Sequence, residues 1–175
     1  MKRYFAILMA AALLSPAFAA AGDLAPYSSL IVRGFSADKA QIANVTPDVE
    51  QTFFRIRREM VEALADGLVT QLKGSFPAVS RTGKKGENAG RIAVIEGNFT
   101  AIDAGRRGLR MWIGFSGTAS ATLQARIMDE RSGKLLAVFE QERSAPLGWA
   151  GSEQVLLQIT GRLAQDLAEF VKKLR

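Results

Sequence analysis

The sequence contains no cysteine and no histidine in its 175 residues. The missing cysteine excludes disulfide bonds, thiolate nucleophiles and thiolate metal sites. The missing histidine excludes Ser-His-Asp and Cys-His catalytic sites and imidazole ligands for metal ions. Carboxylates, lysine, arginine, serine, threonine and tyrosine are the side chains that remain for chemistry. We therefore expect no enzymatic activity, no bound metal and no cofactor.

Long hydrophobic runs are also scarce, and the one at the amino terminus has the layout of a leader. Lys2 and Arg3 precede an uncharged apolar stretch over residues 4–14, and Ala17-Phe18-Ala19 follows as an Ala-x-Ala cleavage site. The stretch is too short for a membrane span, which needs roughly 20 apolar residues. This order of features is typical of a secretory signal peptide.

The leader predicts where the rest of the chain resides. We expect a signal peptide over residues 1–19, cleavage near Ala19, and a single domain over residues 20–175. An uncleaved anchor and a buried amino-terminal helix are the alternatives. The expected product is an exported protein of a bacterial periplasm without a transmembrane span. We expect it not to be a lipoprotein, because lipid attachment needs a cysteine at the cleavage site.

The charge balance is weakly basic. There are 23 Lys and Arg residues against 17 Asp and Glu residues, and the net charge of +6 falls to +4 without Lys2 and Arg3. Since no nucleic-acid-binding motif is present and an exported protein rarely meets nucleic acid, we expect no nucleic-acid partner. The partners that fit are an envelope protein, a second copy of the chain or, by peripheral contact, an anionic membrane surface.

Two segments repeat apolar residues at spacings of three and four, which is the pattern of an amphipathic helix. The first begins at Thr46-Pro47, a capping residue and a proline suited to the first helical position, and ends near Lys73. Its apolar stripe consists of Val49, Phe53, Ile56, Met60, Leu64, Leu68 and Leu72. The second begins with Ser152 as the expected cap, and its stripe consists of Leu156, Ile159, Leu163, Leu167, Phe170 and Leu174.

Segments rich in β-branched and other apolar residues predict the strands. These are a first strand at Leu30–Phe35, a short edge segment at Phe76–Val79, and a meander of three strands at residues 91–102, 118–127 and 135–142. We expect a loop over residues 37–45. The elements favour an α+β fold, a two-layer sandwich of a mostly antiparallel sheet of about four to five strands with both amphipathic helices on one face.

The middle strand of the meander alternates strictly between apolar and polar residues. Ala119, Ala121 and Leu123 alternate with Thr118, Ser120 and Thr122. Because neighbouring side chains of a strand point to opposite faces, one face of the sheet is buried. The other face is small and hydroxylated, and we expect it to be open to water or to a partner.

The segment from Asp103 to Ser120, with its flanks, resembles the domain of unknown function 4410 family, whose members look like bacterial envelope proteins. The family pattern is an E-G strand, then G-x-R-x-L-R-x-x-x-G-F-G-x-G, then a V-x-V-R-hydrophobic-x-D strand and a G-K turn. The matching residues are Glu96, Gly97, Gly105, Arg107, Leu109, Arg110, Gly114, Phe115, Gly117, Arg126, Asp129, Gly133 and Lys134. Tyr27, the first strand and the long helix also suit the opening of the family. The resemblance implies a fold and an envelope location but no mechanism.

Within this segment, arginines and aromatic residues form a basic and aromatic cluster. The candidate binding residues are Arg106, Arg107, Arg110, Trp112 and Phe115. One interpretation is a loop that binds a small anionic ligand, a lipid or a glycolipid. The other is structural, with Trp112 and Phe115 in the core and the arginines solvated or paired with Asp103.

Four carboxylates on the predicted strands and turns are the remaining candidates for chemistry. They are Glu96, Asp103, Asp129 and Glu140. Two of them, Glu96 and Glu140, lie on different strands, where a facing pair would suit acid–base work. Charges on a solvated sheet face explain them equally well. We predict a non-catalytic exported domain that acts by protein–protein interaction or assembly in the cell envelope, with ligand binding through the Arg106–Phe115 loop as the alternative.

Overall fold

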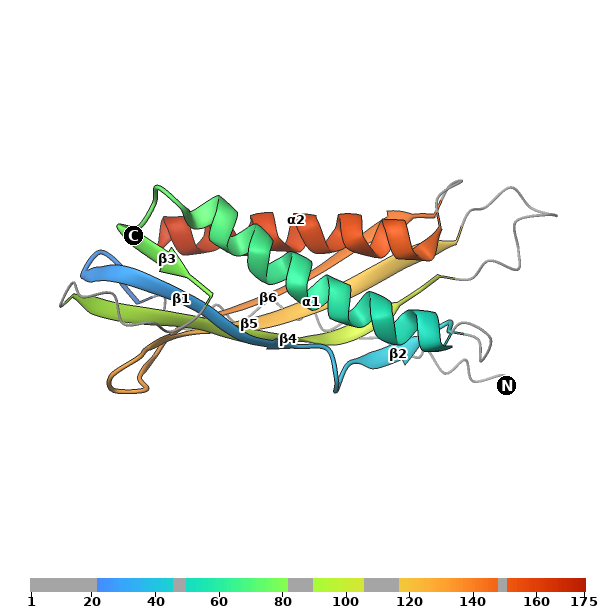
Figure 1. Ribbon diagram of the computed structural model, residues 1–175, viewed down its shortest axis with the longest axis horizontal. Coiled ribbons are helices and arrows are strands. Elements are labelled where there is room, and N and C mark those ends of the chain that lie inside the picture. The colour runs from blue at the N-terminus through green and yellow to red at the C-terminus, as the bar shows by residue number, and fades with distance from the viewer. Residues whose placement is uncertain (1–21, 46–49, 82–89, 106–116, 148–150) are drawn as a thin grey trace, which may run out of the picture.

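A computed structural model describes residues 22–45, 50–81, 90–105, 117–147 and 151–175. Two helices cover one face of a single sheet, as Figure 1 shows. In chain order the elements are β1 (Tyr27–Ser36), β2 (Gln41–Ala43), α1 (Glu50–Leu72), β3 (Ala78–Ser80), β4 (Arg91–Asp103), β5 (Thr118–Asp129), β6 (Leu135–Pro146) and α2 (Ser152–Lys173). The predicted α+β sandwich with both helices on one face is confirmed.

The sheet is mixed rather than purely antiparallel. Five of its six strands follow the order β3-β1-β4-β5-β6, and the sixth, β2, pairs with the far end of β4. The predicted meander is present, because β5 runs antiparallel to both β4 and β6. The amino-terminal strands pair differently, since β1 is parallel to both β3 and β4.

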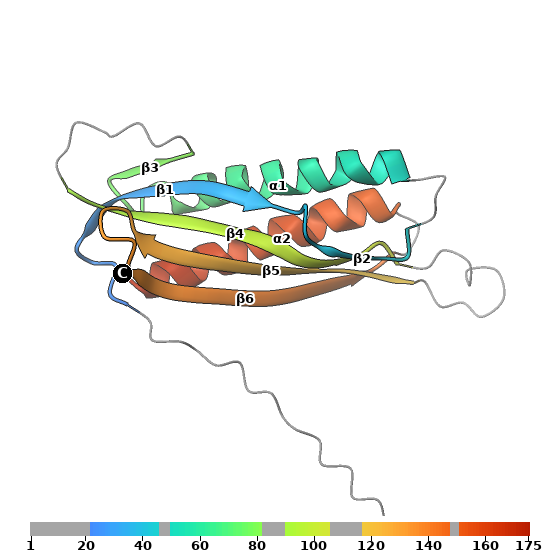
Figure 2. The same cartoon turned by 90° about the horizontal axis from the view of Figure 1, so that it is seen from below.

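The parallel pairing follows from the path of α1. This helix carries the chain back along the sheet, so that β3 and β4 both start at the end where β1 starts (Figure 2). A parallel pair needs such a crossover, whereas a hairpin joins antiparallel strands. The amphipathic pattern predicts the helix and its buried stripe, but the return direction of the chain appears only in the fold.

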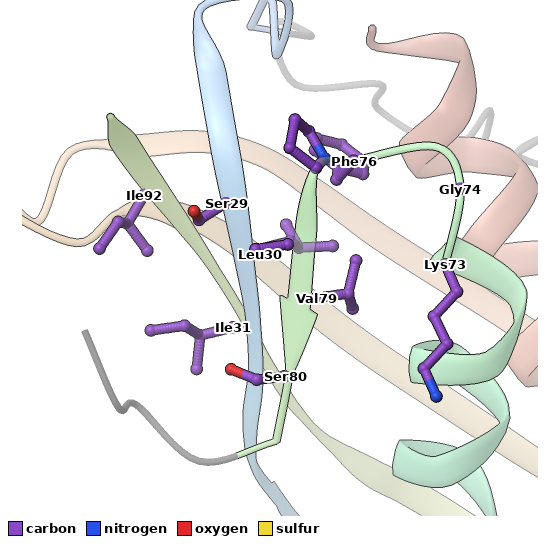
Figure 3. A pocket seen from close by; sticks show the side chains of 11 residues that line it. Ser29, Leu30, Ile31, Lys73, Gly74, Phe76, Val79, Ser80 and Ile92 are labelled. Carbon is purple, nitrogen blue, oxygen red and sulfur yellow. The ribbon is translucent and has the colours of Figure 1, made fainter. Parts of the chain in front are cut away.

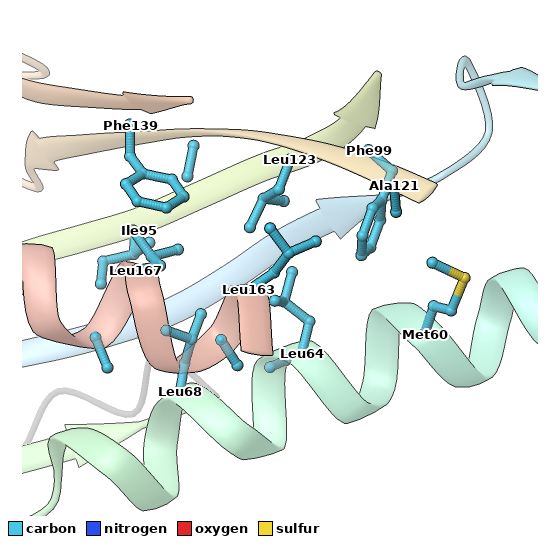
Figure 4. Packing of buried hydrophobic residues seen from close by; sticks show 14 of the residues in the cluster. Met60, Leu64, Leu68, Ile95, Phe99, Ala121, Leu123, Phe139, Leu163 and Leu167 are labelled. Carbon is cyan, nitrogen blue, oxygen red and sulfur yellow. The ribbon is translucent and has the colours of Figure 1, made fainter. Parts of the chain in front are cut away.

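The core lies between the helix layer and the inner face of the sheet. The two helices run in the same direction and pack side by side, with α1 against β1 and β3 and α2 against β5 and β6 (Figures 1 and 2). Figure 4 shows Leu64 and Leu163 from the two helices directed toward Phe99 and Leu123 of the sheet, and all four side chains are fully buried. The described residues of both predicted stripes therefore pack into this core, and burying them is the main stabilising contribution to the fold. Val49 and the predicted start at Thr46-Pro47 lie outside the described residues.

Two local predictions are wrong. Residues 37–45 contain the short strand β2, which pairs in parallel with residues 101–103 of β4 and extends the line of β1 after a turn. All three residues of β2 are exposed, so no hydrophobic alternation marked it in the sequence. Ser152 is the first residue of α2 rather than its cap; Gly151 occupies the cap position, and no side chain caps the helix there.

Candidate functional site

The sheet face opposite the helices is the polar face that the alternation in β5 predicts. Its β5 residues include Ser120, Thr122 and Gln124, which are partly or fully exposed, whereas Ala121 and Leu123 between them are buried. Figure 2 shows this open face from below, with the helices behind the sheet. Polar side chains on this face do not pack into the core between the sheet and the helices.

A groove of about 340 Å³ crosses this open face over β1, β4 and β5. Its lining residues are Gly34, Ser36, Asp38, Lys39, Glu96, Gly97, Asn98 and Arg126. Gly34 has a φ of 66°, and the pairing of β1 with β4 shifts register between Val32 and Phe35. The left-handed backbone of Gly34 produces this bulge at low cost, which opens the strand pair beside the groove.

An ion pair lines one wall of the groove. Arg126 Nη2 of β5 donates a hydrogen bond to Glu96 Oε1 of β4 at 3.0 Å, and the two residues are direct cross-strand partners. At the other wall the Ser36 hydroxyl donates to the Asp38 carboxylate at 2.9 Å and accepts from the Asp38 backbone N–H. The groove therefore presents hydrogen-bond donors and acceptors and charges of both signs.

A second hollow, of about 440 Å³, lies where β3 meets β1 near the end of α1. Figure 3 shows Leu30, Ile31, Val79 and Ile92 around it, so the lining is largely apolar. Among the described residues that line it, Lys73 is the charged one, and its side chain runs alongside α1 in this view. We attribute this hollow to the short β3, which covers little of the neighbouring strand.

A cluster of polar side chains joins the start of β1 to the hairpin between β5 and β6. Tyr27 Oη donates to Asp129 Oδ2 at 2.9 Å, and Arg91 Nη2 donates to both of these oxygens, at 2.8 Å to Tyr27 and 3.0 Å to Asp129. Ser132 donates its backbone N–H and its hydroxyl to Asp129 Oδ1. The guanidinium of Arg91 also lies over the Tyr27 ring, 4.5 Å from its centre.

These contacts fix the protonation states of the cluster. The backbone N–H of Ser132, followed by Arg91, the Ser132 hydroxyl and Tyr27, holds the pKa of Asp129 well below its usual range. Burial, followed by the Asp129 carboxylate, raises the pKa of Tyr27. The ionised carboxylate of Asp129 accepts four hydrogen bonds, and these tie the starts of β1 and β4 to the β5–β6 hairpin.

The fold does not bring the candidate carboxylates together. Glu96 pairs with Arg126, whereas Glu140 lies beyond β5 and accepts a 3.4 Å hydrogen bond from Gln124. Asp103 accepts from the Asn44 amide and from the Gly105 backbone N–H, both at 2.7 Å. Among the described residues, no group of three or more acidic side chains is arranged to hold a metal ion.

The predicted binding cluster lies outside the described residues. Arg106, Arg107, Arg110, Trp112 and Phe115 all fall in the gap between residues 105 and 117, so both interpretations of that loop remain predictions. Sequence analysis missed the groove, because its residues come from three separate segments. The signal available was the pair of matching positions Glu96 and Arg126, which are 30 residues apart and carry opposite charges.

Comparison with known families gives one match over most of the chain. The model of the family described as Domain of unknown function (DUF4410) matches residues 30–148. No curated protein sequence matches this chain significantly. In the part of the chain that the structure describes, no helix is both long and apolar enough to cross a membrane.

Several solved structures share the fold at low identity. An uncharacterised protein is 14% identical with a TM-score of 0.54, and covers 87% of this chain and 97% of its own. A DUF330 protein from Xanthomonas campestris is 14% identical with a TM-score of 0.51, covering 89% of this chain and 92% of its own. A hypothetical protein from Chlamydia trachomatis is 11% identical with a TM-score of 0.51, covering 83% and 96%. At such identities the likeness shows the fold alone.

Proposed function

This chain belongs to the DUF4410 family, a domain of unknown function, and on that premise we propose that it is a non-catalytic exported domain that binds a protein partner in the cell envelope. The binding surface is the groove on the open face of the sheet. The observation that carries the proposal is the ion pair between Glu96 and Arg126, which lines the groove on the sheet face away from the helices.

The groove residues contribute little to the stability of the fold. Arg126 and Glu96 have 59% and 26% of their side chains exposed, and an exposed ion pair of this kind contributes about 0–1 kcal/mol. Asp38 and Lys39 are exposed as well. Charged side chains with so small a structural role favour recognition, because charge patterns across an interface select the partner and set its orientation.

Three features support a binding role over catalysis. The carboxylate that is buried, Asp129, is locked in its ionised form by four donors. The carboxylate in the groove, Glu96, is neutralised by an arginine rather than placed beside a second acid. The whole sequence also lacks histidine and cysteine. General acid–base or nucleophilic catalysis usually relies on such groups.

The location in the envelope rests on the leader. The basic start, the apolar stretch and the Ala17-Phe18-Ala19 site are the features that direct a chain to export. A partner reached after export is an envelope protein or a second copy of this chain.

A charge swap and site-specific cross-linking test the proposal together. A photo-reactive amino acid replaces Lys39 beside the groove or, as the control, Gln165 on the exposed side of α2, in the source cells. We expect a discrete cross-linked product from position 39 and none from position 165. The double variant Glu96→Arg with Arg126→Glu keeps the ion pair and the fold but inverts the charge pattern, and we expect it to lose the product.

Three results would contradict the proposal. They are no product from position 39, the same product from both positions, or full cross-linking by the swapped variant while circular dichroism shows a native fold. A product of twice the chain mass identifies the partner as a second copy and retains the groove as the interface.

A further inference from the structure

One end of the molecule carries a group of exposed basic side chains, which we call the basic end. It comprises the start of β4, the β5–β6 hairpin and the last turn of α2. Its residues are Arg91, Arg131, Lys134, Lys172, Lys173 and Arg175, and all six are exposed. The acidic residues of these three segments are Asp129, which is buried in its hydrogen-bonded cluster, and Glu130, and the adjoining amino-terminal segment adds Asp23. This end is therefore more basic than the chain as a whole.

Backbone hydrogen bonds hold these segments side by side. The N–H of Leu24 donates to the carbonyl of Leu174 at 2.7 Å, and the N–H of Gly22 donates to the carbonyl of Leu136 at 2.8 Å. The end of α2 therefore lies beside the start of β6, with the amino-terminal segment between them. Both ribbon views place the C-terminus, the β5–β6 hairpin and the starts of β1 and β4 at the same end (Figures 1 and 2).

Structural roles explain only some of these charges. Lys172 and Lys173 interact favourably with the carboxyl end of the α2 dipole, and Arg91 pairs with Asp129. Arg131 and Lys134 have no such role, because neither forms an ion pair with any other described residue. They flank the turn of the hairpin, where an uncharged polar residue would serve the turn equally well.

An exposed apolar side chain accompanies the charges. Leu135 follows Lys134 directly and is 49% exposed, one of three large hydrophobic residues that stand exposed in the described part of the chain. Basic residues around an exposed leucine are the combination that binds the interface of an anionic bilayer, by headgroup attraction and shallow insertion. Leu135 begins β6 directly after the hairpin turn, so the charges and the exposed leucine lie together at this end of the sheet.

The amino terminus joins the domain at this same end. Gly22 lies between β6 and the end of α2, three residues after the expected cleavage position Ala19. The described chain therefore begins at the basic end.

From these observations we propose that the basic end, with Leu135 at the start of β6, rests on a bilayer surface of anionic phospholipid headgroups. This surface is separate from the groove on the open face, and it leaves the groove accessible to a partner. Attraction of this kind contributes about a fivefold gain in binding for each basic side chain near the surface. It weakens with salt, because the charges involved are exposed.

Vesicle sedimentation tests the surface with a matched control. The test variant is Arg131→Glu, Lys134→Glu and Lys173→Glu in the chain without residues 1–19. The control is Arg33→Glu, Arg58→Glu and Arg162→Glu, three exposed arginines away from the basic end that form no ion pair with a described residue. Both variants change the net charge by the same amount, so a loss confined to the test variant assigns the binding to this end.

The original chain and the control should sediment with vesicles of phosphatidylglycerol and not with vesicles of phosphatidylcholine. The test variant should bind at least about 100-fold more weakly. Equal loss in both variants, or no binding by the original chain at low salt, overturns the proposal.

Fluorescence then tests the orientation. Because the sequence has no cysteine, Leu135→Cys and Ile42→Cys each provide one position for an environment-sensitive dye. Ile42 is 39% exposed and lies on β2, at the opposite end of the molecule (Figure 1). We expect a blue shift with anionic vesicles at position 135 only, and a shift at position 42 alone or at neither position contradicts the proposal. Neither readout depends on a partner at the groove, so the two proposals fail independently.

Discussion

The hydroxyl of Tyr27 donates a 2.9 Å hydrogen bond to the carboxylate of Asp129, although the two residues are 102 positions apart. Tyr27 begins β1 and Asp129 ends β5, so the bond joins strands that are not neighbours in the sheet. Arg91, at the start of the intervening β4, donates to both oxygens. Three strands are therefore tied at one end by a single ionised carboxylate.

The stability of the domain should depend on pH through this carboxylate. The folded-state pKa of Asp129 lies below its unfolded value of about 3.9, so its contribution is complete above that value and is lost as the pH falls further. Urea unfolding at pH 6, 4 and 3 should show Asp129→Asn less stable than the original chain at pH 6. The difference should shrink toward pH 3, and a constant difference would contradict the assigned role.

The ring of Tyr27 and its hydroxyl have separable roles. Tyr27→Phe keeps the buried ring and the contact with Arg91 but removes the donor to Asp129. We expect a lower urea midpoint than in the original chain, because the carboxylate loses one of its four donors. Tyr27→Leu should lower the midpoint further, since it also removes the ring under the guanidinium.

The glycine after Glu96 is required by close packing of two strands. A Cβ added to Gly97 would lie 2.3 Å from the carbonyl oxygen of Gln124 and 2.8 Å from Cα of Ala125. Because both atoms belong to the backbone, Gly97→Ala should destabilise the domain by about 2 kcal/mol or more, measured by urea unfolding. Gly161→Ala is the control, because nothing lies within 4 Å of its added Cβ, and it should stabilise α2 by about 0.5–1 kcal/mol.

The core prediction compares two leucines. Leu163 of α2 is fully buried between the helices and the sheet, and Leu163→Ala should cost about 2–5 kcal/mol of unfolding free energy. Leu135→Ala removes the same atoms from a side chain that is 49% exposed, and should cost less than about 1 kcal/mol. Similar losses at the two sites would mean that α2 does not pack on the sheet as described.

The ion pair in the groove should matter little to folding. Arg126→Glu places two like charges on directly opposed residues and should lower stability by about 1 kcal/mol or less, with a smaller effect at high salt. Adding Glu96→Arg should restore the loss. A large loss that the second substitution does not restore would give the pair a structural role and remove it from the proposed binding surface.

Sequence patterns predicted correctly those helices and strands whose apolar residues repeat at a regular spacing. The stripes of both helices and the alternation of β5 each repeat at the period of their own structure, so residues such as Leu64, Leu163 and Ala121 were assigned to the buried face correctly. The short strand β2 and the cap of α2 were missed. The three residues of β2 are all exposed and show no hydrophobic alternation. Gly151 and Ser152 are adjacent residues that both suit the cap position of α2.

The candidate site was predicted only in part. The family resemblance included Glu96 and Arg126 among its matching positions. Nothing in their spacing showed that they are direct cross-strand partners on β4 and β5. Ser36, Asp38 and Lys39 reach the groove only because Gly34 bends β1 beside β4. Such a surface depends on register and bulges, which are set by contacts between distant segments.

The sequence by itself determined the class of the fold, the two helices and the strands of the meander, because amphipathic patterns act over a few residues. It also determined the absence of thiol and imidazole chemistry, since that depends on composition alone. Only the tertiary structure decided the parallel pairing of β1, the contact of Tyr27 with Asp129, the groove and the basic end. Each of these joins residues far apart in the chain, and their meeting depends on the direction in which α1 returns the chain and on the register of the strands.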